Sequence, residues 1–164
     1  ILNRAGYTEM VTKHFARWKR YGGALSLAVI DLDLFKEIND RYGHAAGDKV
    51  LATVASKLKE VIRESDVLCR YGGEEFVLLL PETSVDDART MLEKLRRHIE
   101  DCPFRHKETP VRVTMSCGVG QFRANDNIDS VFERADRAMY TAKQGGRNQV
   151  KTEADLDGNA PTEL

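Results

Sequence analysis

Residues 25–33 read Leu-Ser-Leu-Ala-Val-Ile-Asp-Leu-Asp, and this stretch decides the fold class of the chain. Its first six residues form a short apolar run, which is typical of a strand buried within a sheet. Asp31 and Asp33 follow at once, and carboxylates at the end of a buried strand are costly unless a partner satisfies them. The stretch therefore predicts a core strand that ends in acidic residues in need of a partner.

Helices and further strands alternate along the rest of the chain. Apolar residues at helical spacing predict helices over residues 3–20, 35–42, 45–63, 84–100 and 127–144. Apolar, β-prone runs predict strands over residues 67–71, 76–80 and 111–122, the last with potential breaks at Gly118 and Gly120, and a short edge strand at 149–150. Gly72 and Gly73 between two of these runs predict a hairpin. We therefore expect an α+β fold with a mixed, largely antiparallel central sheet flanked by helices.

Composition limits the class of protein. The chain of 164 residues has the length of one domain, and its formal net charge of −1 argues against non-specific nucleic-acid binding. No apolar run is long enough to span a bilayer, and the first residues lack a signal-peptide pattern. Cys69, Cys102 and Cys117 do not form a disulfide or zinc pattern, which favours a reducing, cytoplasmic location. We expect one domain over residues 1–150 and a polar, flexible tail over 151–164.

Acidic residues from two strands are expected to meet at one edge of the sheet. Pairing of the two strands would bring Asp31 beside Glu74. Clustered carboxylates stay ionised together most easily with a cation between them, and Mg²⁺ prefers such oxygen ligands. A glycine hairpin with solvated glutamates explains the same residues, and spacing alone leaves both interpretations open. An EF-hand loop does not fit, because Phe35 and Lys36 occupy the positions of a ligand and of the turn glycine.

Basic residues lie near two predicted helix ends. Lys36 lies in a turn that opens a helix, where free N–H groups favour anions. Lys143 and Arg147 bracket the glycine pair that ends the last helix. All three are candidates for binding phosphate, although such residues are more often partners of a helix dipole.

Three long motifs, in order and at similar intervals, resemble the GGDEF family of diguanylate cyclase domains. Residues 31–48 resemble its DxDxFKxIND..GH..GD block, residues 70–76 its signature in the GGEEF form, and residues 135–148 its ADxAxYxAK..GRN block. The resemblance covers about residues 1–150 and implies a fold like that of nucleotidyl cyclases and polymerase palm domains. It implies a reaction in which the 3′-hydroxyl of each of two GTP molecules attacks the α-phosphate of the other. The products would be cyclic di-GMP and two pyrophosphates.

The resemblance also implies partners and residue roles. Each domain would hold one GTP, so a second copy of the domain is needed, with Mg²⁺, or Mn²⁺ as the alternative, as cofactor. The metal would be held by Asp31, Glu74 and the carbonyl of Leu32. Catalysis would involve Glu74, Glu75 and Lys36. The nucleotide would be bound by Leu34, Phe35, Lys36, Gly72, Gly73, Lys143 and Arg147.

Asn39 and Asp48 are implied to read the guanine base. A carboxylate can accept hydrogen bonds from both N1–H and the exocyclic amine of guanine, and adenine offers no such edge. His44, Asp33 and Asp40 belong to the same motif, but capping and local hydrogen bonds explain them without a chemical role.

Arg63 and Asp66, shortly before the signature, resemble the family's RxxD motif for inhibition by the product. An arginine fork can pair with guanine O6 and N7, and a carboxylate can accept from another edge of the base. The plain alternative is a surface ion pair. Arg96 or Arg97 on the following helix, from the same or a partner domain, is a further candidate for this site.

Two other functions stay open at this point. One is a non-catalytic receptor for GTP or cyclic di-GMP, and the other is a different nucleotidyl transferase or purine cyclase on the same fold. The intact signature at residues 72–76 favours a cyclase, and Asn39 and Asp48 favour guanine. Only the end of the family's opening segment is visible at residues 1–4, so we expect a domain cut from a longer protein with an upstream sensory or dimerising part. That parent protein could be tethered to a membrane.

Overall fold

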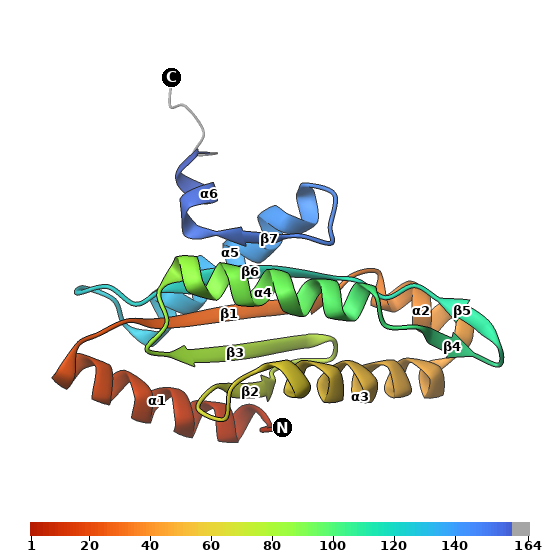
Figure 1. Ribbon diagram of the computed structural model, residues 1–164, viewed down its shortest axis with the longest axis horizontal. Coiled ribbons are helices and arrows are strands. Elements are labelled where there is room, and N and C mark those ends of the chain that lie inside the picture. The colour runs from red at the N-terminus through yellow and green to blue at the C-terminus, as the bar shows by residue number, and fades with distance from the viewer. Residues whose placement is uncertain (159–164) are drawn as a thin grey trace.

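A five-stranded sheet forms the centre of the protein. The computed structural model describes residues 1–158, with the side chains of residues 1–156. Figure 1 shows the strands stacked in the order β2-β3-β1-β6-β7, with α4 in front of the sheet and α5 behind it. All neighbouring pairs are antiparallel except β6 and β7. The strands are β1 (Leu25–Leu32), β2 (Val67–Arg70), β3 (Glu75–Pro81), β6 (Met115–Gln121) and β7 (Val150–Thr152). The α+β prediction is confirmed.

Strand β1 lies in the middle of the sheet because both of its faces are apolar. Ile30 and Leu32 pack into a core on one face, under α2, α3 and α4. Leu27 and Val29 pack into a second core on the other face, against α1 and α5. The only polar residue within the run is Ser26, whose buried hydroxyl donates to the carbonyl of Thr83 at 2.7 Å.

The long helices begin and end close to the predicted positions. Asn3, Ser84 and Asn127 cap three of them, and each side chain accepts a hydrogen bond from a backbone N–H of the first turn. The helices are α1 (Arg4–Tyr21), α2 (Phe35–Tyr42), α3 (His44–Val61), α4 (Val85–Glu100), α5 (Ile128–Gln144) and α6 (Glu153–Gly158).

The predicted strand over residues 111–122 begins too early, and the potential breaks at Gly118 and Gly120 are absent. Its first residue belongs to a separate hairpin of β4 (Phe104–His106) and β5 (Thr109–Val111). Strand β6 then runs unbroken through Gly118 and Gly120. A Cβ atom at Gly118 would lie 2.0 Å from the carbonyl oxygen of Ala135, so glycine lets α5 pack directly on the strand.

Residues 151–158 are ordered where a flexible tail was expected. They complete β7 and form α6, and Thr152 and Glu153 are buried. Arg134 of α5 donates to the Glu153 carboxylate at 2.7 Å, which attaches α6 to the domain. The remainder of the predicted tail, residues 159–164, lies outside the described residues.

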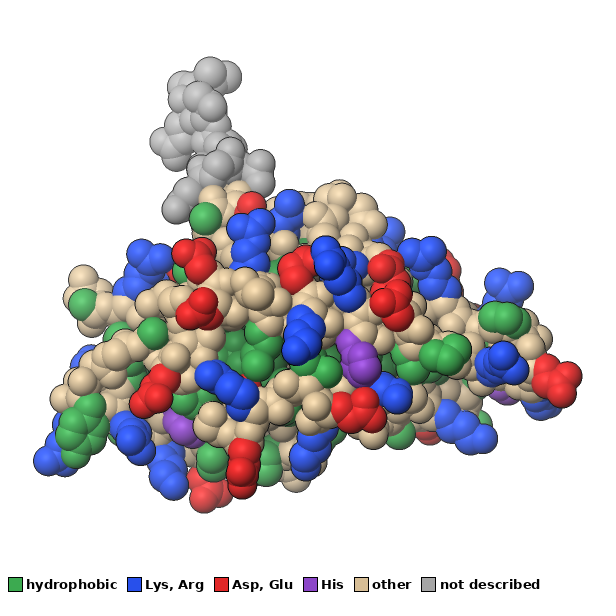
Figure 2. Space-filling view, viewed as in Figure 1, with side chains coloured by type: hydrophobic (Ala, Val, Ile, Leu, Met, Phe, Trp, Pro, Cys, Tyr) green, Lys and Arg blue, Asp and Glu red, His purple; other side chains and the backbone are tan. Residues whose placement is uncertain are grey.

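Charges of both signs are mixed over the visible face of the domain in Figure 2, in line with the net charge of −1. Any anionic ligand must therefore be held by a local group of residues. Within residues 1–158, no helix is long and apolar enough to cross a membrane.

Candidate functional site

Two acidic strand ends meet where β1 pairs with β3. Asp31 lies opposite Glu75 in the strand register, and the N–H of Leu32 donates to the carbonyl of Glu74 at 3.2 Å. The structure thus brings Asp31, Glu74 and Glu75 to one edge, as the strand pairing predicted. Both glutamates are half-buried, Glu74 at the end of the turn that joins β2 to β3 and Glu75 at the start of β3.

Lys143 of α5 supplies a cation to this edge. Its Nζ lies 2.9 Å from Oδ1 of Asp31 and 2.8 Å from Oδ1 of Asp33, and it donates to the Leu32 carbonyl at 3.2 Å. Two of these oxygens, on Asp31 and Leu32, belong to the predicted metal-ligand set. The position is therefore one that attracts positive charge.

Asp33 is a fully hydrogen-bonded structural carboxylate. It is 4% exposed and accepts hydrogen bonds from the hydroxyls of Thr114 and Ser116, both at 2.7 Å, and from the N–H of Asn148 at 2.9 Å. Burial alone would raise its pKa, but the hydrogen bonds from Lys143, Ser116 and Thr114 outweigh that effect and hold its pKa below the ordinary value. Asp33 therefore stays ionised and joins the end of β1 to β6 and to the loop after α5.

The neighbouring carboxylates are less well compensated. Burial raises the pKa of Asp31 despite its hydrogen bond with Lys143. Burial, followed by the charges of Asp136, Asp31 and Glu74, raises the pKa of Glu75 to about 7. Burial also raises the pKa of Asp136 on α5, a residue that the sequence did not single out. Excess negative charge of this kind is typical of sites that bind a cationic ligand.

The start of α2 forms the next part of the site. Leu34 adopts a left-handed conformation at φ 54°, and no side chain caps the helix there. Phe35 is buried, whereas Lys36 is exposed and makes no ion pair or hydrogen bond within the described residues. The first turn therefore presents free backbone N–H groups and an unpaired ammonium group, a combination that suits an anion.

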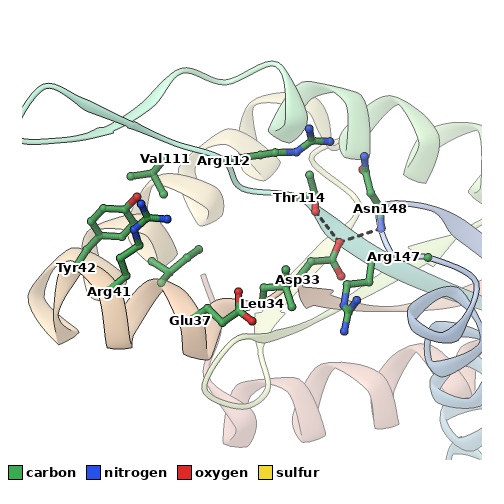
Figure 3. A pocket seen from close by; sticks show the side chains of 12 residues that line it. Asp33, Leu34, Glu37, Arg41, Tyr42, Val111, Arg112, Thr114, Arg147 and Asn148 are labelled. Atoms are coloured by element: carbon green, nitrogen blue, oxygen red, sulfur yellow. Dashed lines mark hydrogen bonds between the residues drawn. The ribbon is translucent and has the colours of Figure 1, made fainter.

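Arg147 faces the same region from the loop after α5. A cavity of about 390 Å³ lies between α2, the segment that joins β5 to β6 and this loop, and Arg147, Leu34 and Asp33 are among its lining residues. Figure 3 shows Arg147 beside Asp33, with Asn148 and Thr114 hydrogen-bonded to the carboxylate. Within the described part of the chain the Arg147 side chain has no ion pair or hydrogen bond, so its guanidinium group is available to a ligand.

Asn39 and Asp48 come close through a glycine contact between α2 and α3. A Cβ atom at Gly47 would lie 1.8 Å from Oδ1 of Asn39, so only glycine leaves room for this amide. Asp48 is exposed and lines a cavity of about 350 Å³ that also includes Leu51 and Phe76. The two predicted base-reading residues therefore lie on adjoining helices, and Asp48 borders the cavity.

The turn at Gly72 and Gly73 is open to solvent. A Cβ atom at Gly73 would meet no atom within 4 Å, and neither glycine has a positive φ. Internal packing and backbone conformation therefore do not require glycine here. Arg70 shapes the turn by donating to the carbonyls of Gly72 and Gly73 at 3.3 and 2.9 Å, a role that the sequence analysis missed.

The second predicted site lies at the far end of α3. Arg63 and Asp66 contact each other, with Arg63 Nη2 3.0 Å from Oδ1 of Asp66, and Arg63 also donates to Thr83 at 2.6 Å. Both residues line a cavity of about 470 Å³ with Ile62. Arg63 and Asp66 thus form the ion pair that was the alternative to a product site, and a cavity that a ligand could enter lies beside them.

Arg96 is held by contacts within its own domain. Its side chain is only 12% exposed, and it pairs with Glu93 at 3.1 Å and with Asn148 at 2.9 Å. Arg96 is not among the residues that line the cavity beside Arg63, and a role there for Arg96 or Arg97, from the same or a partner domain, stays a prediction. Arg97 is exposed.

Comparisons with known proteins agree with this architecture. Residues 1–149 match the family described as "Diguanylate cyclase, GGDEF domain". The chain is 48% identical over 149 residues to diguanylate cyclase DgcP of Pseudomonas aeruginosa, covering 91% of this chain and 22% of that protein. It is 41% identical over 151 residues to the response regulator PleD of Caulobacter vibrioides, covering 90% and 33%. The chain therefore spans about a fifth to a third of the length of these relatives.

Solved structures show the same fold. The GGDEF domain of DgcB from Caulobacter crescentus, in complex with c-di-GMP, superposes with a TM-score of 0.89 at 33% identity, covering 93% of this chain and 91% of that one. The active GGEEF domain of a diguanylate cyclase from Vibrio cholerae superposes with a TM-score of 0.87 at 35% identity, covering 93% and 97%. The chain belongs to the GGDEF family of diguanylate cyclase domains.

Proposed function

We propose that this domain is a diguanylate cyclase of the GGEEF type that condenses two GTP molecules into cyclic di-GMP and releases two pyrophosphates. The observation that carries the proposal is the meeting of Asp31 and Glu74 beside unpaired cationic groups, with Asp48 on a cavity that also reaches Phe76 of β3. One end of the domain thus offers acidic residues, phosphate-binding groups and base-reading acceptors. The catalytic domain would comprise residues 1–150, with the ordered residues that follow attached to it.

The donor set fits a hard divalent cation. Asp31, Glu74 and the Leu32 carbonyl offer oxygen atoms, the ligands that Mg²⁺ and Mn²⁺ prefer. Within the described residues no three His, Cys, Asp or Glu side chains form a ready metal cluster, so phosphate oxygens of the nucleotide would have to complete the coordination. When bound, the metal would lower the pKa of the attacking hydroxyl and offset phosphate charge.

The cationic side chains would hold the triphosphate. Lys36 and Arg147 are unpaired within the described residues, and the first turn of α2 adds backbone donors near Leu34 and Phe35. Lys143, whose ammonium group contacts Asp31 and Asp33, would be a third cation for the phosphates. Gly72 and Gly73 would leave room for the nucleotide, because nothing else requires glycine there.

Asn39 and Asp48 would select guanine, because their acceptors match its N1–H and amine groups. Glu75 would assist in positioning the metal or the hydroxyl. One domain binds one nucleotide in this scheme, so catalysis needs a second copy of the domain facing the first. Arg63 and Asp66 would bind product and slow the enzyme. The buried Cys69 and Cys117 suit a cytoplasmic protein, where GTP is available.

The test is incubation of the purified chain with GTP and Mg²⁺, beside an ATP control, with products identified by chromatography and mass. Cyclic di-GMP from GTP alone supports the proposal, and a rate rising more than linearly with protein concentration supports pairing of two domains. If no product forms, the same assay on an artificially dimerised version decides. If the dimerised version also forms no product but still binds nucleotide, the domain would be assigned a receptor function in place of cyclase activity.

A further inference from the structure

The loop that carries Arg147 has an unusual backbone. Gly146, Arg147 and Asn148 adopt positive φ angles of 109°, 66° and 47° in succession. The left-handed region is unfavourable for residues with a Cβ, so two consecutive non-glycine residues stay there only when their surroundings hold them. Contacts that fix this loop therefore also fix the backbone position from which the Arg147 side chain extends.

Asn148 is held on its backbone and on its side chain. Its N–H donates to Oδ2 of Asp33 at 2.9 Å, which joins the loop to the end of β1 (Figure 3). Its side-chain oxygen accepts a hydrogen bond from Arg96 at 2.9 Å, and its side-chain N–H group donates to the Glu100 carboxylate. Arginine can only donate and carboxylate can only accept, so the two partners fix the orientation of the amide.

Arg96 and Glu100 form a clamp on α4, one helical turn apart. The Arg96 side chain is 12% exposed, and it also pairs with Glu93 at 3.1 Å and with Glu100 at 3.6 Å. These pairs leave Arg96 little freedom to move. The clamp belongs to a helix that carries none of the proposed nucleotide-binding residues.

We infer that Arg96 and Glu100 are positioning residues for phosphate binding, acting through Asn148 on Arg147. The clamp holds Asn148 in the left-handed conformation, and the adjoining Arg147 then points into the cavity beside Leu34 and Asp33. The inference rests on the proposed function, because it takes phosphate as the ligand of Arg147. A purely structural role in packing α4 would instead affect all ligands and the fold alike.

The test is a double-mutant cycle between Arg96→Met and Arg147→Ala, read by calorimetric binding of two probes. One probe is a non-hydrolysable GTP analogue with Mg²⁺, and the other is GMP, which lacks the β- and γ-phosphates. Arg96→Met is expected to weaken binding of the GTP analogue about tenfold and binding of GMP less than about twofold. The double variant should bind the analogue no more weakly than Arg147→Ala alone. Arg89→Met, an exposed arginine on the same helix, is the matched control and should bind like the wild type.

A second pair of variants tests the clamp if Arg96→Met folds poorly. Asn148→Gly accepts the left-handed backbone without strain but lacks the amide, and Asn148→Ala lacks both advantages. Both variants should weaken binding of the GTP analogue more than binding of GMP, and Asn148→Ala should have the larger effect.

Three results would overturn the inference. They are equal weakening of GMP and the GTP analogue, additive effects in the cycle, or unchanged analogue affinity in Arg147→Ala. Turnover of GTP by the unmodified chain, measured alongside, reports on the cyclase separately, so a failed clamp and a failed cyclase are distinguishable.

Discussion

The two ends of the β1–β6 strand pair carry charged clusters of opposite character. At one end, Asp31 and Glu75 have raised pKa values, and the side chain of the nearby Arg147 has no ion pair or hydrogen bond within the described residues. At the other end, after β6, Asp126 and Glu153 both pair with Arg134. Incomplete pairing at the first end is what a site needs if its ligand is to complete the charge balance, whereas complete pairing serves stability.

The second end forms an anchor, defined here as Arg134, Asp126 and Glu153. Arg134 donates to Asp126 at 2.8 Å, to Glu153 at 2.7 Å and to the carbonyl of Gln121 at 2.8 Å. The hydrogen bond from Arg134 is the largest of several effects that lower the pKa of Asp126 to about 2. All of these side chains are used within the domain, which leaves the anchor no capacity for a ligand.

Glu74→Gln, at the first end, is expected to have the largest effect on activity. The substitution keeps the shape but removes a charge from the proposed metal-ligand set, so turnover should fall at least about 1,000-fold. The melting temperature should stay close to that of the unmodified protein, because Glu74 is half-buried and makes no ion pair within the described residues. Steady-state turnover and thermal melting measure the two effects, and full activity would remove the metal hypothesis.

The second largest effect is expected for Asp48→Asn, which should reduce selectivity for the guanine base. An amide offers one acceptor and one donor where guanine needs two acceptors, so the preference for GTP over ATP should fall about 100-fold. Competition binding of the two nucleotides measures this preference. Asp40→Asn, an exposed acid on α2 without an assigned role, is the control, and an equal change in both variants would contradict base reading.

The anchor should respond to Asp126→Asn with a loss of stability and no loss of activity. Its folded pKa of about 2 lies below the ordinary value of 3.8. Its contribution to stability is therefore present above pH 3.8 and disappears as the pH falls through about 2. The variant should lose about 2 kcal/mol at pH 7.

Urea unfolding of both proteins across this pH range measures the difference, which should shrink toward zero on acidification. A difference independent of pH would show that the Asp126 charge does not stabilise the anchor.

Arg63→Ala probes a cluster that shares features with both ends, because Arg63 and Asp66 are paired with each other and yet line a cavity. Loss of the arginine fork should raise the product concentration needed for half-inhibition about tenfold and leave the initial rate unchanged. Initial rates at increasing cyclic di-GMP measure this. If the variant is half-inhibited at the same cyclic di-GMP concentration as the unmodified protein, the Arg63–Asp66 pair has a structural role alone.

The acidic ends of the two strands could be predicted because they depend on local patterns. An apolar run precedes Asp31 and two glycines precede Glu74, but these residues meet at one edge only because β1 pairs with β3. The β4–β5 hairpin was missed because its strands of three residues are too short for a periodic signal. Lys143 and Asp33 are 110 positions apart, so their contact depends on the packing of α5 over the sheet. The ordering of residues 151–158 likewise depends on Arg134, a partner that local composition does not reveal.

The most direct test of this account compares cyclic di-GMP formation from GTP and Mg²⁺ by the unmodified chain, Glu74→Gln and Asp126→Asn. All three are assayed at one temperature at which each is folded, with the product identified by mass. The account predicts product from the unmodified chain and from Asp126→Asn at similar rates, and none from Glu74→Gln. Product from Glu74→Gln at the unmodified rate, or its loss in folded Asp126→Asn, would contradict the division of roles between the two ends.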